Sequence, residues 1–192
     1  LGPGLSTADQ TEDLVRALVN HAGATGQPMV LDADALNAIS PLVDSGVSVP
    51  AGAILTPHPG EMARLLGCSV PHVQAQRVDT AREIATAHAV TVVLKGAPTV
   101  IAAPDGEVYF NPTGNPGMAT GGSGDVLTGL VAGLLAQGLE PVDAAILGVY
   151  AHGLAGDIAA RDRGRGLLAG DILRAIPQAL LTLDEHTEGE AI

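Results

Sequence analysis

Short apolar runs alternate with longer stretches of helical character along the first half of the chain. The apolar runs predict buried strands, and the stretches between them predict helices. Strands are expected at residues 28–31, 53–56 and 90–95, and helices at 7–21, 35–39, 59–66 and 71–88. Strands that alternate with helices in this way are typical of βαβ units built around a parallel sheet.

The middle of the chain has a different pattern. Residues 99–102 and 107–110 flank Pro104-Asp105-Gly106, which is typical of a hairpin turn. We expect this short antiparallel hairpin to finish one edge of the sheet. A loop is expected at 111–122, followed by helices at 123–137, 141–161 and 169–183, the last of them kinked or interrupted at Pro177. The pattern therefore predicts an α/β fold with a mostly parallel central sheet flanked by helices.

The chain is interpreted as one domain. No internal repeat or linker divides residues 1–183, and the acidic residues 184–192 are expected to form a frayed tail. The turn Gly2-Pro3-Gly4 opens the chain without a strand before it, although such turns usually follow a strand. We therefore expect the first βα units of this domain to be missing from the 192 residues.

Composition narrows the classes of partner. Hydrophobic residues make up 46% of the chain and charged residues 16%, which is typical of a globular protein. The net charge is -12, and the absence of any run of Lys or Arg argues against binding to nucleic acid or to an anionic membrane. There is no apolar run of about 18 residues and no signal peptide at the N-terminus. The single cysteine, Cys68, fits a cytoplasmic protein.

Glycines in the segment GNPGMATGGSGDVL, residues 114–127, lead directly into an apolar helix. The N–H groups of such a helix start lie at its positive end and can bind phosphate oxygens without basic side chains. Asp125 would lie in the first turn, where its ionised carboxylate could accept a proton from an attacking hydroxyl. The alternative interpretation is a flexible loop with a helix-capping aspartate.

Other glycine-rich motifs do not match. A Walker A loop requires Gly-Lys-Ser/Thr, and this segment has no lysine. A Gly-x-Ser-x-Gly elbow would require glycine at the position of Asp125. The pairs Gly2-x-Gly4 and Gly122-x-Gly124 lack the third glycine of a dinucleotide fingerprint. Aromatic residues are only 2% of the chain, so a nucleotide base would be held mainly by aliphatic groups and backbone.

Polar residues follow the three predicted parallel strands, where open α/β sheets bind ligands. His58 could donate to a ligand oxygen or could simply stand at a helix start. His58 and Glu61 have no third metal ligand nearby in sequence, so no metal site is predicted there. Asp32 could orient Mg²⁺ or a ligand hydroxyl, whereas Asp34 is expected to cap the next helix. Lys95 either reaches a phosphate or is solvated.

These segments, taken in order, resemble the ADP/ATP-dependent NAD(P)H-hydrate dehydratase family of the ribokinase-like superfamily. The resemblance rests on GPGLS, LDADALN, LTPHPGE, LKGAPT, GNPGMATGGSGDVLTGL and AHGLAGDIAA. LTPHPGE and GNPGMATGGSGDVL are specific to this family, while the Gly-x-Gly-Asp core fits the whole superfamily. The chain departs from the family at Ser6, where another glycine is usual, and in the N-terminal βα units that it lacks.

The resemblance implies repair of hydrated NADH or NADPH by an enzyme that self-associates. ADP or ATP, with Mg²⁺, would phosphorylate the ring hydroxyl, and loss of phosphate would restore the coenzyme. Asp125 would be the catalytic base. The residues implied in nucleotide binding are Lys95, Gly96, Ala97, Pro98, Thr99, Gly121, Gly122, Ser123 and Gly124. Those implied in substrate binding are Gly2, Gly4, Asp32, His58, Asn115 and Asp125. The alternatives are a vitamin or thiazole kinase of the same superfamily and a nucleotide-binding module without catalysis.

Overall fold

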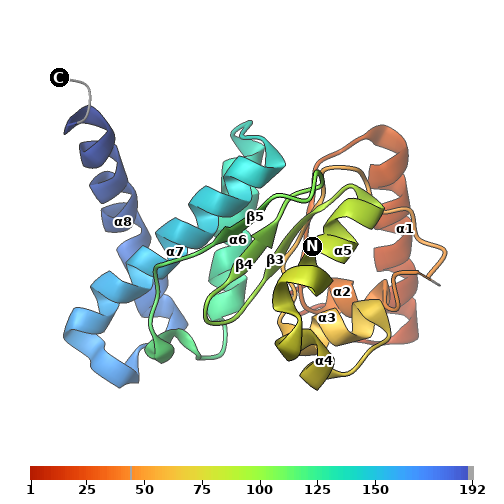
Figure 1. The fold of residues 1–192 in the computed structure, drawn as a ribbon, viewed down its shortest axis with the longest axis horizontal. Helices are drawn as coiled ribbons and strands as arrows, with labels where there is room; N and C mark the ends of the chain where they lie inside the picture. Colours follow the sequence, from red (N-terminus) through yellow and green to blue (C-terminus); the bar gives the residue numbers. More distant parts are fainter. Residues whose placement is uncertain (44, 190–192) are drawn as a thin grey trace.

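A five-stranded mixed sheet forms the centre of the molecule in the computed structural model, which describes residues 1–43 and 45–189 (Figure 1). The strands lie in sequence order: β1 (Val30–Leu31), β2 (Ile54–Leu55), β3 (Thr91–Leu94), β4 (Val100–Ala102) and β5 (Val108–Phe110). β1, β2 and β3 are parallel, whereas β4 and β5 are antiparallel to their neighbours. The predicted α/β class and the edge hairpin are confirmed.

Helices cover both faces of this sheet (Figure 1). On one side lie α1 (Asp9–Thr25), α2 (Asp34–Ala38), α3 (Pro59–Leu66), α4 (Val70–Ala75) and α5 (Arg77–His88). On the other lie α6 (Ser123–Ala136) and α7 (Pro141–Arg163), and α8 (Ala169–Gly189) packs against α7 and α6 away from the sheet. None of the helices within the described ranges is long and apolar enough to cross a membrane.

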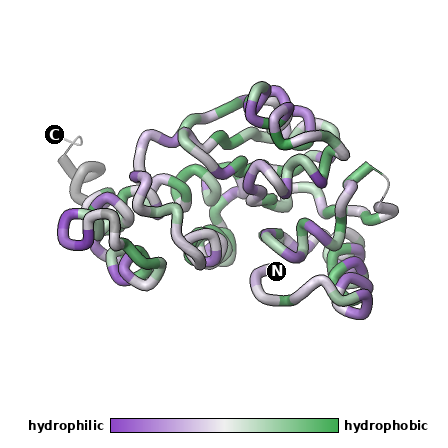
Figure 2. Tube along the Cα trace, turned by 90° about the horizontal axis from the view of Figure 1, so that it is seen from below, coloured by the Kyte–Doolittle hydropathy of each residue, from purple (hydrophilic) through white to green (hydrophobic). Residues whose placement is uncertain are grey.

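Alternate strand residues enter two different cores. Leu31, Leu55 and Val92 pack with α1, α2, α3 and α5, whereas Val30, Ile54 and Val93 pack with α6 and α7. Successive side chains of a strand point to opposite faces, so a sheet covered on both sides needs continuous apolar runs. Figure 2 shows hydrophobic segments running through the middle of the molecule and many of the hydrophilic ones along its outer parts.

Two predicted helices differ from those observed. The helix expected at 71–88 is divided at Gln76, whose φ of -130° and ψ of 43° lie outside the helical range, so α5 starts at Arg77. α8 passes through Pro177 and continues to Gly189 instead of ending at residue 183. Ile172 and Ala179, both fully buried, hold α8 in the core on either side of Pro177 and offset the hydrogen bond that proline cannot make. Residues 190–192 of the expected tail lie outside the described residues.

The backbone of Leu1 lies along the free edge of β1. Leu1 N donates to Val30 O at 2.7 Å, and Asp32 N donates to Leu1 O at 3.1 Å. Leu1 thus pairs with β1 as a residue of a neighbouring strand would. This arrangement brings the Gly2-Pro3-Gly4 turn to the carboxyl end of β1, which is also where Asp32 begins the next loop.

Candidate active site

The carboxyl ends of the three parallel strands meet the N-terminus of α6. Asp32 directly follows β1, Lys95 directly follows β3, and Thr128 lies in the second turn of α6. Lys95 Nζ donates to Asp32 Oδ1 at 2.7 Å, and Thr128 Oγ1 donates to Asp32 Oδ2 at 2.6 Å. These three residues, called here the Asp32 cluster, join strand ends to the glycine-rich helix start.

Asp32 is 1% exposed, so its charge requires partners. Both of its carboxylate oxygens have one, which is the condition under which a buried carboxylate is tolerated. The Lys95 side chain is 22% exposed, so its ammonium is shielded without being sealed from solvent. A Cβ on Gly124 would stand 3.4 Å from Lys95 Nζ and 3.7 Å from Asp32 Oδ2. A methyl group at the second residue of α6 would therefore be in van der Waals contact with this ion pair, and glycine leaves that space open.

The Gly2 turn packs against the same strand end. Gly2 is buried with a φ of +139°, and a Cβ there would lie 1.8 Å from the Asp32 carbonyl oxygen. Gly4 has a φ of +76° and faces open space. Ser6 N donates to Asp34 Oδ2 at 2.8 Å. The expectation that Asp34 caps the next helix is wrong: the N-cap of α2 is Ala33, and the Asp34 carboxylate instead accepts from this turn.

His58 stands at the start of α3, after β2. Its Nδ1 accepts from Gly60 N at 2.9 Å and Glu61 N at 3.2 Å, while Glu61 Oε2 accepts from His58 N at 2.7 Å. This reciprocal capping box fixes the helix start and leaves the imidazole about half exposed. Glu61 is 5% exposed, and its Oε2 lies 3.8 Å from Lys95 Nζ. His58 thus caps the start of α3, and Glu61 connects it to the Asp32 cluster.

Asp125 lies in the exposed part of the first turn of α6. Gly121 and Gly122 before it are exposed, and Gly122 has a φ of +84° that favours glycine. Ser123 N bonds to Thr120 O at 3.3 Å, and Val126 N bonds to Gly122 O at 3.2 Å. Between them, the N–H groups of Gly124 and Asp125 belong to the first turn, which offers them no acceptor within the helix. This is the geometry of an anion site beside an exposed carboxylate.

A hollow of about 430 Å³ opens next to Asp125, between α6 and α8. Its lining is mainly aliphatic and consists of Asp125, Val126, Gly129, Leu130, Leu173 and Ile176. A flat ring held here would contact aliphatic side chains, with the carboxylate of Asp125 at one side.

His152 of α7 is buried next to the start of α6. Loss of solvent lowers its pKa from 6.5 to about 4, against the opposing effect of a backbone hydrogen bond with Ser123. The imidazole is therefore neutral near pH 7. Its Nε2 is a buried side-chain nitrogen without a hydrogen-bond partner in the part of the chain that the structure describes.

Asn115 is held by its own loop. Its Nδ2 donates to Asp157 Oδ1 at 2.9 Å, and its Oδ1 accepts from Gly117 N at 3.0 Å. Asp157 Oδ2 also accepts from Gly114 N at 2.9 Å, which fastens the loop to α7. The hydrogen bonds of Asn115 thus go to this loop rather than to the Asp32 cluster.

Three residues of the site were not identified from the sequence. Thr128 lies three positions after Asp125, on the helix face toward β1, and Asp157 lies within the AHGLAGDIAA segment without a motif of its own. Arg77 underlies the loop of residues 95–99, donating from Nη2 to Leu94 O at 3.0 Å and to Pro98 O at 3.0 Å. Only the helical spacing of Thr128 relative to Asp125 offered a signal in the sequence.

Two solved structures similar to this chain define its fold class. A ribokinase-like superfamily protein from Enterococcus faecalis is 30% identical, with a TM-score of 0.80 over 95% of this chain and 62% of its own. A crystal structure of ADP/ATP-dependent NAD(P)H-hydrate dehydratase from Bacillus subtilis, obtained with ATP and Mg²⁺ and soaked with CoA, is 34% identical, with a TM-score of 0.80 over 95% of this chain and 64% of its own. The fold is therefore ribokinase-like.

The family model for NAD(P)H-hydrate dehydratase matches residues 1–178. The chain belongs to this family. A bifunctional NAD(P)H-hydrate repair enzyme from Moorella thermoacetica is 52% identical over 189 residues, which are 98% of this chain and 35% of that protein. The chain thus spans about a third of this curated relative and less than two thirds of the two structures.

Proposed function

We propose that this chain catalyses the nucleotide-dependent dehydration of hydrated NADH or NADPH. The observation that carries the proposal is the position of Gly124, in the first turn of α6, where a Cβ would stand 3.4 Å from Nζ of the Lys95–Asp32 ion pair, with Asp125 exposed as the next residue. Phosphoryl transfer requires donors that bind the phosphate oxygens, a cation near them and a carboxylate base. The name of the Bacillus subtilis relative agrees with this chemistry.

The nucleotide would bind between two backbone segments. Residues Gly121–Gly124 form the positive end of α6, and the loop Lys95–Thr99 begins near it, since a Cβ on Gly124 would stand 3.4 Å from Lys95 Nζ. Lys95 adds a positive charge where the net charge of the chain is -12. Backbone donors thus carry most of the anion binding in this acidic protein, because the charge of Lys95 is already paired with Asp32 at 2.7 Å.

Asp125 would act as the base. The oxygen of the ring hydroxyl attacks the terminal phosphorus of ADP or ATP, its proton passes to Asp125, and the bond from that phosphorus to the bridging oxygen breaks. Loss of the phosphate from the ring carbon, together with a proton from the adjacent carbon, then restores the double bond of the reduced nicotinamide. Exposure of Asp125 at the side of the aliphatic hollow between α6 and α8 supports this role.

The hydrated coenzyme would lie over the strand ends. Gly2 packs against Asp32, and the turn at Gly4 faces open space, so its backbone can contact a ligand at the end of β1. His58 has a half-exposed imidazole, and Glu61 links it to Lys95. Asn115 would contribute through the loop that it fastens to Asp157. These contacts are part of the proposal, as are Asp32 and the base Asp125.

Mg²⁺ fits the available donor groups as a partner of the nucleotide. The described residues contain no group of three or more His, Cys, Asp or Glu side chains able to hold a metal ion. Mg²⁺ commonly binds through substrate phosphates and water with few carboxylates, so the nucleotide can supply its ligands and Asp125 stays free to act as the base. Bound to the nucleotide, the ion would neutralise charge on the phosphate oxygens.

The test uses this chain with hydrated NADH, Mg²⁺ and either ADP or ATP, and follows the return of near-ultraviolet absorbance of the reduced nicotinamide. Recovery that requires a nucleotide supports the proposal. A stable phosphorylated product that leaves the protein would indicate a small-molecule kinase instead. Nucleotide binding without recovery of either product would contradict catalysis by this chain.

A further inference from the structure

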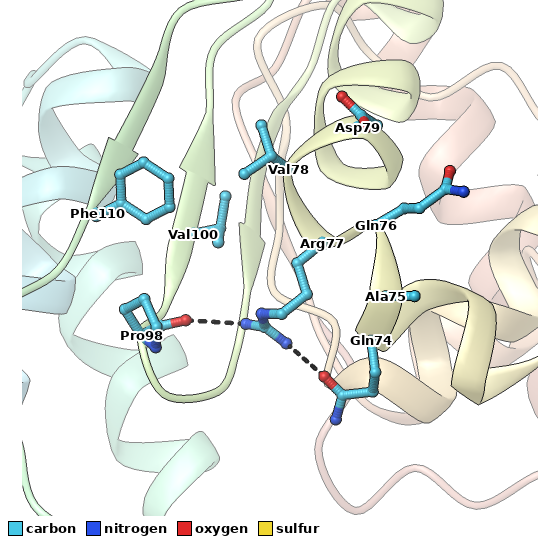
Figure 3. A pocket seen from close by; sticks show the side chains of 9 residues that line it. All are labelled: Gln74, Ala75, Gln76, Arg77, Val78, Asp79, Pro98, Val100 and Phe110. Atoms are coloured by element: carbon cyan, nitrogen blue, oxygen red, sulfur yellow. Dashed lines mark hydrogen bonds between the residues drawn. The ribbon is translucent and has the colours of Figure 1, made fainter.

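Arg77 lies beneath the loop of residues 95–99. It is the first residue of α5, and its guanidinium reaches three carbonyl groups of the segment that joins β3 to β4. Nη2 donates to Leu94 O at 3.0 Å, Lys95 O at 3.3 Å and Pro98 O at 3.0 Å. Nη1 donates to Gln74 Oε1 at 3.2 Å, which anchors the guanidinium on the α4 side (Figure 3).

The loop is fitted closely around this guanidinium. Gly96 has a φ of +152°, and a Cβ there would stand 2.6 Å from Arg77 Nη2. Burial lowers the pKa of Arg77, but a guanidinium remains charged at any physiological pH. The break at Gln76 starts a new helix at Arg77 and so lets its side chain leave α5 toward β3. The positive charge of the guanidinium is therefore held against the loop carbonyls, on the α5 side of the loop.

The direction of these carbonyls determines where the loop N–H groups point. In a trans peptide the N–H points opposite to the C=O of the same peptide plane. Because the carbonyls of Lys95 and Pro98 turn toward Arg77, the N–H groups of Gly96 and Thr99 turn away from it. Gly96 is exposed and Thr99 is partly exposed, so donors on this side are accessible to a ligand.

We propose that Arg77 is a positioning residue that turns the N–H groups of Gly96 and Thr99 toward a bound nucleotide. This inference rests on the proposed nucleotide site. Arg77 faces a separate hollow of about 310 Å³ with Pro98, Val100 and Phe110, on the α5 side of the loop, and it acts on the ligand through the loop (Figure 3).

The first experiment measures the affinity for Mg²⁺-ADP and Mg²⁺-ATP by calorimetry in the wild-type chain, R77A and R82A. Arg82 is a matched control because it lies in the same helix and donates to Gly106 O at 3.0 Å, in the hairpin turn. We expect R77A to lose about tenfold or more in affinity, since the loss of two well-placed backbone hydrogen bonds to the nucleotide accounts for such a factor. R82A should stay within about twofold, and millimolar guanidinium should partly rescue R77A alone. Equal affinities of R77A and the wild-type chain would overturn the proposal.

A second readout needs no nucleotide. The amides of Lys95, bonded to Pro57 O at 2.9 Å, and of Asn111, bonded to Thr99 O at 3.0 Å, hold the two ends of the loop, so their hydrogen exchange should quicken in R77A and stay unchanged in R82A. A wild-type chain without nucleotide affinity would count against the proposed function, and the exchange rates would then decide on Arg77 by themselves. Unchanged exchange at both amides in R77A would overturn the positioning role.

A double-mutant cycle tests the contact between the two residues. G96A places a Cβ against the guanidinium and also strains the backbone at a φ of +152°. In the R77A background only the backbone strain remains, so G96A should reduce nucleotide affinity less there than in the wild-type chain. Equal effects of G96A in the two backgrounds would contradict the close fit between loop and guanidinium.

Discussion

Thr128 donates its hydroxyl hydrogen to Asp32 Oδ2 at 2.6 Å, across 96 positions of sequence. The bond connects the second turn of α6 to the end of β1. Since the other oxygen of Asp32 is held by Lys95, one buried carboxylate sets the spacing between the helix start, the lysine and the strand end. The relative positions of the helix-start N–H groups and the lysine in the proposed site thus depend on the buried carboxylate of Asp32.

The substitution Thr128→Val should destabilise the protein by about 2 kcal/mol, because it leaves a buried charged oxygen without its donor while keeping the shape of the side chain. Urea unfolding measures the difference. Thr86→Val is the matched control, since the hydroxyl of Thr86 bonds only to carbonyls within its own exposed helix turn. Similar decreases in the free energy of unfolding of the two variants would show that the bond to Asp32 stabilises the protein no more than an exposed one.

Asp125→Asn should keep nucleotide affinity within a few-fold while turnover of hydrated coenzyme falls by about 10²–10⁴, the usual effect of losing a general base. Steady-state kinetics and calorimetry measure the two quantities separately. Asp143→Asn is the control, because Asp143 is also an exposed aspartate in the first turn of a helix, α7. Unchanged turnover in Asp125→Asn would exclude the role assigned to this carboxylate.

His152 should make stability depend on pH below neutrality. Its pKa is about 4 when folded and 6.5 otherwise, so between these values only the unfolded chain binds the proton. The free energy of unfolding should therefore fall as the pH drops from about 6.5 toward 4, by on the order of 2 kcal/mol at pH 5.

Urea unfolding of His152→Gln at pH 7 and pH 5 measures this contribution. The variant should lose less stability than the wild-type chain between the two pH values, whereas His72→Gln, at an exposed position, should behave like the wild-type chain. An identical loss in His152→Gln and the wild-type chain would contradict the low pKa of His152.

Two glycines in neighbouring helices should respond to alanine with opposite signs. A Cβ on Gly153 of α7 would lie 2.1 Å from Thr113 Oγ1, so Gly153→Ala should push the loop at 111–118 away from α7 and destabilise the protein. Gly133 of α6 is exposed and has open space, so Gly133→Ala should stabilise by roughly 0.5–1 kcal/mol. Thermal unfolding of both variants checks the signs, and a stabilising Gly153→Ala would refute the close packing of this loop.

Local pattern was enough to predict most elements. The apolar runs before Asp32, His58 and Lys95 identified the parallel strands, and Pro104-Asp105-Gly106 identified the hairpin, because strand burial and turn chemistry act over a few residues. The break at Gln76 could not be predicted this way. The sequence there continues a helical pattern, and the break coincides with contacts of Arg77 to carbonyls 17 to 21 positions away.

The sequence by itself determined the glycine-rich start of α6, the place of Asp125 in its first turn and the likeness to the dehydratase family, since each depends on residues adjacent in the chain. Tertiary structure alone decided the partners of these residues. It directed Asp34 to Ser6 instead of a helix cap, and it brought Thr128 and Lys95 to Asp32. The physical reason is burial: a carboxylate removed from water must find donors wherever the fold brings them, and sequence distance does not limit that choice.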